Sequence, residues 1–314
     1  MKVAYIIFNL FHKRQLKYNV AAYKALGLKK RYFSSVSSKD FEGLKDKKPT
    51  INDADNIHQK IEKIDLFKKL SDTDQRSLLD FDLNGFASIK HYLNEEQVDK
   101  INEEIDRLLE SNAINPLGNG KIMFACRHSK IINDLGNNAG LKQLLSALFG
   151  KNAILFQSIN FFSGSEQHTH SDSIHMTTFP EGGLLGVWFA LEDITIENGP
   201  LHYYPGSHKL PYYMNGDYNN EGNKWLLGDK SYSEYEKMIE EKINQYQIKK
   251  QVFLAEKGDL FIWHANLFHG GEPHTNKAMT RKSMVLHYFR EGDVCYHEIT
   301  QRPALMDRFN LTTK

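Results

Sequence analysis

From residue 150 onward the sequence is a succession of short runs rich in aromatic and β-branched residues, and this pattern constrains the fold more than any other feature. Turn signals such as Asn198-Gly199-Pro200 and Lys257-Gly258 separate the runs. Short strands joined by such turns are typical of an antiparallel barrel or jelly roll. We therefore predict a mainly β core with flanking helices, with strands at 153–163, 184–193, 201–204, 251–255, 259–263 and 283–290.

Helical patterns come before this β region. Residues 85–89 have the pattern of a short strand, and Asn94 then supplies an N-cap with acidic residues directly after it. Apolar residues at three- and four-residue intervals follow, so we predict an amphipathic helix over 95–111. A second, shorter helix is predicted over 141–149.

The first part of the chain differs in texture from the rest. We predict a helical N-terminal extension over 1–80 and a main domain over 81–314, with a helical insertion near 231–248. Residues 12–48 are rich in Lys. A solvated surface is the simplest interpretation of these lysines, and docking to an acidic partner is the alternative.

Charge and cysteine content narrow the choice of partners and location. Forty Lys+Arg against 39 Asp+Glu leave a net charge of +1, which gives no reason to expect nucleic acid or an anionic membrane as the main partner. Two cysteines, Cys126 and Cys295, are too few for a disulfide framework and fit a reducing compartment. The apolar run within residues 1–11 is too short to span a bilayer and makes a poor secretion signal. We expect a soluble, cytoplasmic protein.

Histidines and one carboxylate within the β region suggest a metal site. His170 and Asp172 lie two residues apart, on the same side of an extended segment, and His269 follows a later strand. Two imidazoles and one carboxylate on one face of a metal form the facial triad that suits Fe(II) and oxygen activation. The alternative is a hydrolytic zinc site formed by His168, His170 and His175.

Arg281 stands at the head of the strand predicted over 283–290. A guanidinium that points into an apolar barrel needs an anion, and its fork fits a carboxylate in bidentate fashion. A facial triad with an inward arginine is what a 2-oxoglutarate site requires, because the keto acid chelates iron at one end and carries a carboxylate at the other. A surface ion pair is the alternative for Arg281.

Six motifs in this order resemble the phytanoyl-CoA dioxygenase family of Fe(II)/2-oxoglutarate-dependent oxygenases. The resemblance covers roughly residues 80–290 and excludes the extension. The motifs are Gly85-Phe86 with the segment 91–98, His170-Ser171-Asp172, the segment 188–195 with Glu197-Asn198-Gly199, Tyr204-Pro205-Gly206-Ser207-His208-Lys209, Gly258-Asp259, and Leu267-Phe268-His269-Gly270 with Arg281.

The resemblance implies a double-stranded β-helix, which is a cupin-like jelly roll. It also implies Fe(II) as cofactor, with 2-oxoglutarate and O2 as cosubstrates. Carried over residue by residue, it makes His170, Asp172 and His269 the iron ligands at the catalytic centre, and it makes Arg281 the residue that binds 2-oxoglutarate.

Further contacts to the cosubstrate are implied for Trp188, Gln157 and Asn160, although a core tryptophan is the alternative for Trp188. The sequence also departs from the family pattern. Relatives often have Ser or Thr two residues after the distal histidine, where this chain has Gly271. Weaker 2-oxoglutarate binding is one expected consequence, and Thr280 as a substitute donor is the other.

Other histidines surround these positions. Strand alternation makes His264 a wall residue and not a ligand. His208 is expected to be structural. His168 and His175 are expected to lie near the ligands or to face the substrate, with a surface location as the alternative.

The sequence therefore predicts an Fe(II)- and 2-oxoglutarate-dependent dioxygenase that hydroxylates a small organic metabolite or acyl derivative. Two alternatives remain, a zinc-dependent hydrolase that uses His168, His170 and His175, and a non-catalytic β-barrel that binds a carboxylated ligand. A small-molecule substrate is expected, without nucleic acid or membrane as partner. We also predict a mobile lid within residues 212–250, with Trp225 among the aromatic residues that cover the substrate. A surface insertion remote from the site is the alternative for this segment.

Overall fold

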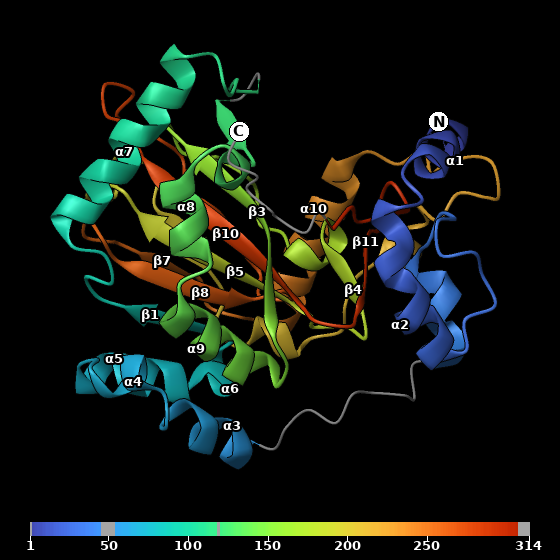
Figure 1. Cartoon of the computed structure of the whole chain (residues 1–314), viewed down its shortest axis with the longest axis horizontal. Helices are drawn as coiled ribbons and strands as arrows, with labels where there is room; N and C mark the ends of the chain where they lie inside the picture. Colours follow the sequence, from blue (N-terminus) through green and yellow to red (C-terminus); the bar gives the residue numbers. More distant parts are fainter. Residues whose placement is uncertain (1, 45–53, 118–119, 307–314) are drawn as a thin grey trace.

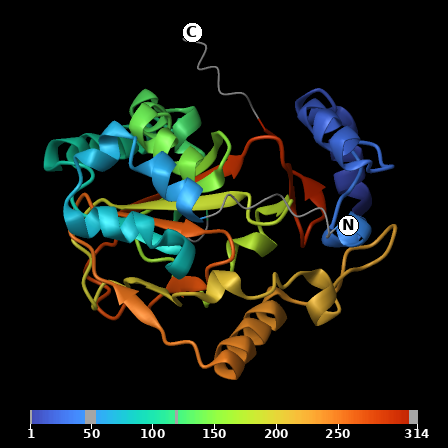
Figure 2. The same cartoon turned by 90° about the horizontal axis from the view of Figure 1, so that it is seen from below.

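The computed structural model describes residues 2–44, 54–117 and 120–306, and it has a β core with helices around it (Figure 1). Two sheets face each other, and all the strand pairings are antiparallel. Helices cover the outer side of the larger sheet, whereas one long helix lies beyond the smaller sheet (Figure 2). The predicted mainly β core with flanking helices is confirmed.

The larger sheet has six strands, and its central strands β5, β8 and β10 are buried on both faces. Its members are β1 (Phe86–Ile89), β2 (Lys121–Met123), β3 (Ala153–Phe161), β5 (Leu184–Ala190), β8 (Leu260–His264) and β10 (Ser283–Arg290), in the order β1-β8-β5-β10-β3-β2. Val187 and Leu286 pack toward the helices, whereas Trp188 and Val285 pack toward the smaller sheet. The two-residue period of a strand produces this alternation.

Strand β3 contains one extra residue. Its register with β10 shifts between His287 and Tyr288, which leaves Phe156 unpaired. As a result, Phe156 and Gln157 both face the space between the sheets. The ring of Phe156 lies 4.8 Å from that of Phe289, and Gln157 hydrogen-bonds to His287. Such a bulge redirects side chains and often lies next to a functional site.

The smaller sheet consists of two three-stranded segments. Its strands are β4 (Thr177–Phe179), β6 (Leu201–Tyr203), β7 (Gln251–Phe253), β9 (His269–Gly271), β11 (Val294–His297) and β12 (Arg302–Pro303), in the orders β7-β6-β9 and β12-β11-β4. A backbone bridge pairs His170 with His269, beside β9. This bridge extends the first segment toward the loop that leads into β4.

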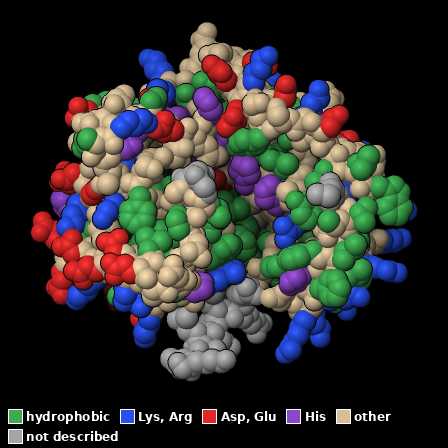
Figure 3. Space-filling view, turned by 90° about the horizontal axis from the view of Figure 1, so that it is seen from above, with side chains coloured by type: hydrophobic (Ala, Val, Ile, Leu, Met, Phe, Trp, Pro, Cys, Tyr) green, Lys and Arg blue, Asp and Glu red, His purple; other side chains and the backbone are tan. Residues whose placement is uncertain are grey.

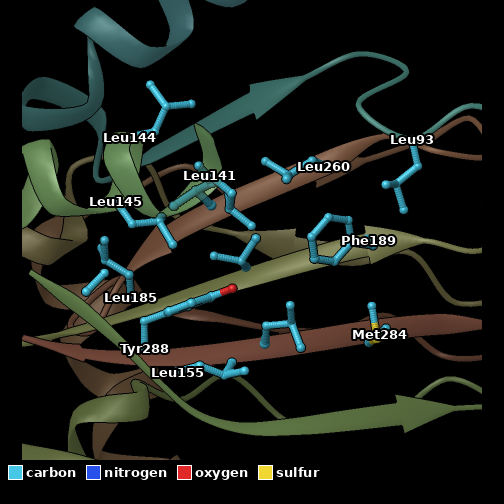
Figure 4. Packing of buried hydrophobic residues seen from close by; sticks show 14 of the residues in the cluster. Leu93, Leu141, Leu144, Leu145, Leu155, Leu185, Phe189, Leu260, Met284 and Tyr288 are labelled. Carbon is cyan, nitrogen blue, oxygen red and sulfur yellow. The ribbon is translucent and has the colours of Figure 1, made fainter. Parts of the chain in front are cut away.

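The main hydrophobic core lies between the larger sheet and the helices α7 (Glu95–Glu110), α8 (Lys130–Gly136) and α9 (Ala139–Phe149). In Figure 4, leucines such as Leu141 and Leu145 of α9 meet Leu185 and Tyr288 of the sheet. Helix α7 begins at a capping box in which Asn94 and Gln97 satisfy each other's backbone N–H groups. The apolar stripe and the cap thus explain why this segment is a helix that packs on the sheet.

The helices of the predicted N-terminal extension lie in two separate places (Figure 1). The first pair packs on β11 and β12, and the later helices pack near α9 and β1. The polar insertion holds a long helix beyond the smaller sheet. The bounds are α1 (Lys2–Phe11), α2 (Asn19–Leu26), α3 (Ala54–Ile61), α4 (Asp65–Lys68), α5 (Asp72–Leu79), α6 (Phe81–Asn84) and α10 (Tyr232–Tyr246). Within the described ranges, no helix is both long and apolar enough to cross a bilayer.

The helices predicted over 95–111 and 141–149 and the long strands are present, with ends that differ by a few residues. Five strands were not predicted, namely β2, β4, β9, β11 and β12. They have two to four residues each, which is too short for a period of two to stand out in a sequence.

The turn before β8 supplies a test of the fold. Gly258 has φ +94°, and a Cβ on it would lie 2.1 Å from the carbonyl oxygen of Leu93. Gly292 has a similar φ of +86°, but nothing lies within 4 Å of its Cβ position. We expect Gly258→Ala to lower the free energy of unfolding by about 2–4 kcal/mol and Gly292→Ala by only about 1 kcal/mol. Urea denaturation measures both, and equal losses would show that the close approach at Leu93 is unimportant.

Candidate metal centre

The bridge between His170 and His269 brings the candidate ligands together. The backbone N–H of each residue donates to the carbonyl oxygen of the other, both at 2.9 Å. Asp172 follows two residues after His170, at the start of a short 3-10 helix, Asp172–Ile174, where Ser171 caps the N-terminus. The sheet pairing therefore fixes where both imidazoles leave the backbone.

His170, Asp172 and His269 form a compact, buried cluster. Nε2 of His170 lies 3.8 Å from Oδ1 of Asp172, and Nε2 of His269 lies 3.9 Å from Oδ2. One ligand atom from each residue falls within 4.8 Å of the others. Each side chain is about 5% exposed, so the three groups can surround an ion that is accessible from one side only.

The outer nitrogens of both imidazoles have backbone partners. Nδ1 of His170 bonds to the carbonyl oxygen of His168 at 2.9 Å, and Nδ1 of His269 bonds to that of Leu267 at 3.0 Å. A carbonyl oxygen only accepts, so both Nδ1 atoms carry the proton and both Nε2 atoms keep a lone pair for a metal. The donor set is two neutral nitrogens and one carboxylate, which suits Fe(II).

Electrostatics support this protonation pattern. Burial, reinforced by the neighbouring His269, holds the pKa of His170 well below its usual value. Burial alone would raise the pKa of Asp172, but His269, His287 and His170 together lower it below its usual range. The site therefore presents the neutral imidazole of His170 beside an ionised carboxylate, which is the state that binds a divalent cation.

Two residues that the sequence analysis missed contact the carboxylate. Trp263 of β8 donates from Nε1 to Oδ2 of Asp172 at 2.8 Å. Nε2 of His287, on β10, lies 3.6 Å from the same oxygen, and Nε2 of Gln157 lies 3.2 Å from Nδ1 of His287. Alternation along β8 and β10 indicates that Trp263 and His287 face inward. Their contacts with Asp172 depend on how strands far apart in the sequence pair in the fold, and no sequence motif indicates that pairing.

Arg281 precedes β10 and is only 2% exposed. Its backbone N–H donates to the carbonyl oxygen of Phe162, and its guanidinium carbon lies 5.8 Å from the centre of the Trp188 ring. Burial lowers its pKa to about 10, an effect that Glu192 partly opposes. Within the described part of the chain, its Nε has no hydrogen-bond partner. A buried cation with an unsatisfied donor suits an anionic ligand and not the surface ion pair.

The three other residues predicted to contact 2-oxoglutarate do not lie on the same side of the larger sheet. Trp188 lies beside Arg281, among the apolar side chains between the two sheets. Gln157 contacts His287, which in turn lies beside the metal ligand Asp172. Asn160 instead pairs with Met284 on the face of β3 that is covered by helices. Its side-chain amide is therefore directed away from the cluster. A strand turns residues three apart to opposite faces, which is the physical reason.

The histidine cluster of the zinc alternative does not form. In the described ranges, the only geometric group of three or more metal-binding side chains is His170, Asp172 and His269. His168 is exposed. The ring centre of His175 lies 6.1 Å from that of His170.

Residues near the ligands have other partners. His264 accepts a hydrogen bond at Nδ1 from the backbone of Asn266, and His208 bonds to the carbonyl oxygen of Asp82. Thr280, the candidate substitute donor, donates to Glu192 at 2.6 Å. Its hydroxyl is therefore already engaged outside the site.

Beyond the cluster, ring contacts lead toward the surface. His175 lies 4.8 Å from the ring of Tyr232 and 5.5 Å from that of His297. Burial lowers the pKa of His175 to about 4 and that of His297 to about 3. Figure 3 shows histidine side chains in a central hollow of one face, with apolar side chains on both sides. Trp225 is 59% exposed, and Tyr232 is the residue of the predicted lid that approaches His175.

Comparisons with known proteins extend these observations. The model of the family described as phytanoyl-CoA dioxygenase (PhyH) matches residues 81–283. A phytanoyl-CoA dioxygenase domain-containing protein 1 homolog from Caenorhabditis elegans is 24% identical over 232 residues, which is 72% of this chain and 76% of the relative. The homolog from Dictyostelium discoideum is 33% identical over 171 residues, which is 53% of each chain.

Two solved structures share the fold. The α-ketoglutarate-dependent carbocyclase SnoK from nogalamycin biosynthesis has a TM-score of 0.59 at 15% identity, over 77% of this chain and 96% of that one. EctD from S. alaskensis, solved with 2-oxoglutarate and 5-hydroxyectoine, has a TM-score of 0.57 at 18% identity, over 74% and 83%. The predicted jelly roll is confirmed. The family model matches about two thirds of this chain. The chain therefore belongs to the phytanoyl-CoA dioxygenase family and is an enzyme of the oxygenase class.

Proposed function

We propose that this protein is an Fe(II)- and 2-oxoglutarate-dependent dioxygenase that hydroxylates a small organic metabolite or acyl derivative. The observation that carries the proposal is the pairing of a preformed His170–Asp172–His269 cluster with the buried guanidinium of Arg281, whose Nε has no hydrogen-bond partner among the described residues. A single ligand that binds the metal at one end and carries a carboxylate at the other would account for both the buried metal cluster and the buried arginine. Family membership supports the same function.

The chain's own residues would prepare the metal. Nε2 of His170, Nε2 of His269 and one oxygen of Asp172 would hold the ion, leaving open positions for cosubstrates. Fe(II) with 2-oxoglutarate bound supplies the activation of O2 for oxidation of a substrate C–H bond. Trp263 orients the Asp172 carboxylate through its hydrogen bond to Oδ2.

Arg281 would bind the distal carboxylate of 2-oxoglutarate, with Trp188 beside it. Ser165, in the loop before His168, would replace the hydroxyl that relatives carry two residues after the distal histidine. Oγ of Ser165 lies 3.0 Å from the position that a Cβ on Gly271 would take, so its hydroxyl occupies the space of the missing side chain. Gly164 packs directly against Arg281, because its Cβ position lies 3.4 Å from Cδ of the arginine.

The substrate side favours an uncharged reacting group. His175 and His297 have lowered pKa values and are therefore neutral near pH 7. Tyr232 adds an aromatic ring next to His175. Lys121 of β2 is half-buried, with its Nζ 5.6 Å from the ring of Phe161. A largely apolar molecule suits this arrangement.

We also propose that the protein is located in the cytoplasm, which is a reducing compartment. Cys126 and Cys295 are both free and buried. Burial raises the pKa of each thiol, which keeps it protonated and unreactive.

The first prediction concerns joint binding of metal and cosubstrate. Adding Fe(II) and 2-oxoglutarate to the metal-free protein without O2 should produce the weak visible absorption band of an Fe(II)–keto acid chelate. Succinate lacks the keto oxygen and should give no band. A folded protein that binds Fe(II) but gives no band with 2-oxoglutarate contradicts the proposal, and one that gives the band without consuming 2-oxoglutarate in air is the binding protein of the alternative.

The second prediction concerns Arg281. We expect Arg281→Lys to weaken 2-oxoglutarate binding about ten- to a hundredfold, because lysine keeps the charge and loses the bidentate fork. Metal affinity should stay the same. Arg107→Lys is the matched control, since Arg107 is paired with Glu104 on the outer face of α7. Calorimetric titration measures both affinities, and an unchanged 2-oxoglutarate affinity in Arg281→Lys places the anchor elsewhere.

The third prediction concerns Trp263. Replacing it by Phe keeps the ring and removes the hydrogen bond to Asp172, so metal affinity should fall about ten- to a hundredfold. Titration of the metal-free protein with Mn²⁺ measures the metal affinity independently of catalytic activity. Trp225→Phe, at an exposed position, should leave the affinity unchanged. Equal affinities in the two variants mean that Trp263 does not orient the carboxylate.

A further inference from the structure

The charge of the chain is distributed unevenly along its sequence. Residues 1–39 contain no Asp or Glu, and the first acidic residue is Asp40, although the whole chain has a net charge of only +1. This segment contains nine basic residues, Lys2, Lys13, Arg14, Lys17, Lys24, Lys29, Lys30, Arg31 and Lys39. The near-neutral total therefore conceals a strongly cationic lobe, formed by α1, α2 and the turns around them.

Helix α1 is oriented opposite to an ordinary surface helix. It buries two polar residues, Lys2 and Asn9. Its apolar residues Val3, Ile7 and Leu10 are exposed, and Phe11 is 83% exposed. These four positions recur at helical spacing, so they form one continuous apolar stripe. A stripe of this kind on the outside of a folded protein marks an interaction surface.

The lobe is attached to the fold through other side chains. Tyr18 donates to the carbonyl oxygen of Ala304 at 2.8 Å, and Leu16 is fully buried. Further along, the ring of Phe41 stacks on Phe179 of β4 at 4.2 Å. Because these contacts hold the lobe in place, the stripe on α1 is left over for a partner.

Basic residues adjoin the stripe. Lys13, Arg14 and Lys17 follow directly after α1, and all three are exposed. Val20, also exposed, continues the apolar character onto α2. Lys30 pairs with Asp40 and Lys39 with Glu221, which leaves the lobe cationic through its other lysines and arginines. A second copy of this chain is a poor partner, because two such lobes repel each other. An apolar stripe bordered by lysines and arginines matches the surface of an anionic bilayer, where acyl chains receive the stripe and headgroups the cations.

We infer that residues 2–39 form a docking surface for anionic lipid membranes. In Figure 3 the lobe is on the right, where apolar and basic side chains gather along the edge, whereas acidic side chains gather on the left. The hollow with histidine side chains opens on the same face. Docking through α1 would therefore bring this hollow close to the bilayer, from which a substrate with an apolar part could enter.

Flotation of the full chain with lipid vesicles tests the inference. Vesicles of phosphatidylcholine with about one third phosphatidylserine should carry the protein upward, and vesicles of phosphatidylcholine alone should carry at least about tenfold less. Raising the salt from about 0.1 M to about 0.5 M should release the protein, because salt screens the lysines and arginines. Equal binding to both vesicles, or binding to neither, overturns the inference.

Matched variants separate the stripe from general stickiness. The double variant Ile7→Ser/Phe11→Ser should lose at least about tenfold in vesicle partitioning, with an unchanged thermal midpoint because both side chains are exposed. Leu83→Ser, which removes a 62% exposed leucine from α6 in another part of the molecule, should bind as the unmodified chain does.

Two results would assign the stripe to another partner. Sedimentation that shows a dimer lost in the double variant would make it a self-association surface. An intact mass that shows removal of the N-terminal basic segment in the source cells would make it a cleaved targeting segment, whose composition is also basic and free of acidic residues. Either result overturns the inference.

Discussion

Two backbone hydrogen bonds between His170 and His269 hold the chemistry of this protein in place. They join a loop residue to the first residue of β9, and they set two imidazoles side by side before any ion is present. Asp172 then needs only a capped turn to bring its carboxylate within 4 Å of both rings. Because the pairing belongs to a sheet and not to a free loop, the ligand positions inherit the rigidity of the core.

The surroundings of this pairing divide into two electrostatic regions. On one side the guanidinium of Arg281 is buried, and within the described ranges its Nε has no hydrogen-bond partner. On the other side burial keeps His175 and His297 neutral. A dianionic cosubstrate and a mostly uncharged substrate would therefore find separate places around one metal. The chain around β10 carries part of this separation, since Arg281 precedes the strand whereas His287, which lies beside Asp172, is within it.

Much of this could be predicted from the sequence, for physical reasons that also explain the omissions. Long strands and helices show several periods of their pattern, and the family motifs carry the metal ligands and Arg281. Trp263 could not be connected to Asp172, because their contact depends on how β8 lies against a loop far away in sequence. The alternation of side chains along a strand already argues against placing both Gln157 and Asn160 beside 2-oxoglutarate, since residues three apart face opposite sides of the sheet. The cationic lobe was hidden because charges were summed over the whole chain.

The unpaired Phe156 in β3 has a consequence for how the site can change over time. By placing two successive side chains on the inner face, the bulge separates the strand into two halves with independent alternation. Ala153 and Leu155 keep contact with the helices, while Gln157 and Ile159 line the interior. Loss of Phe156 would leave Leu155 directly before Gln157, in the register that both residues already have, so Leu155 would stay on the helix side. The bulge can therefore be gained or lost without exchanging the faces of β3, and what it adds to the interior is the ring of Phe156.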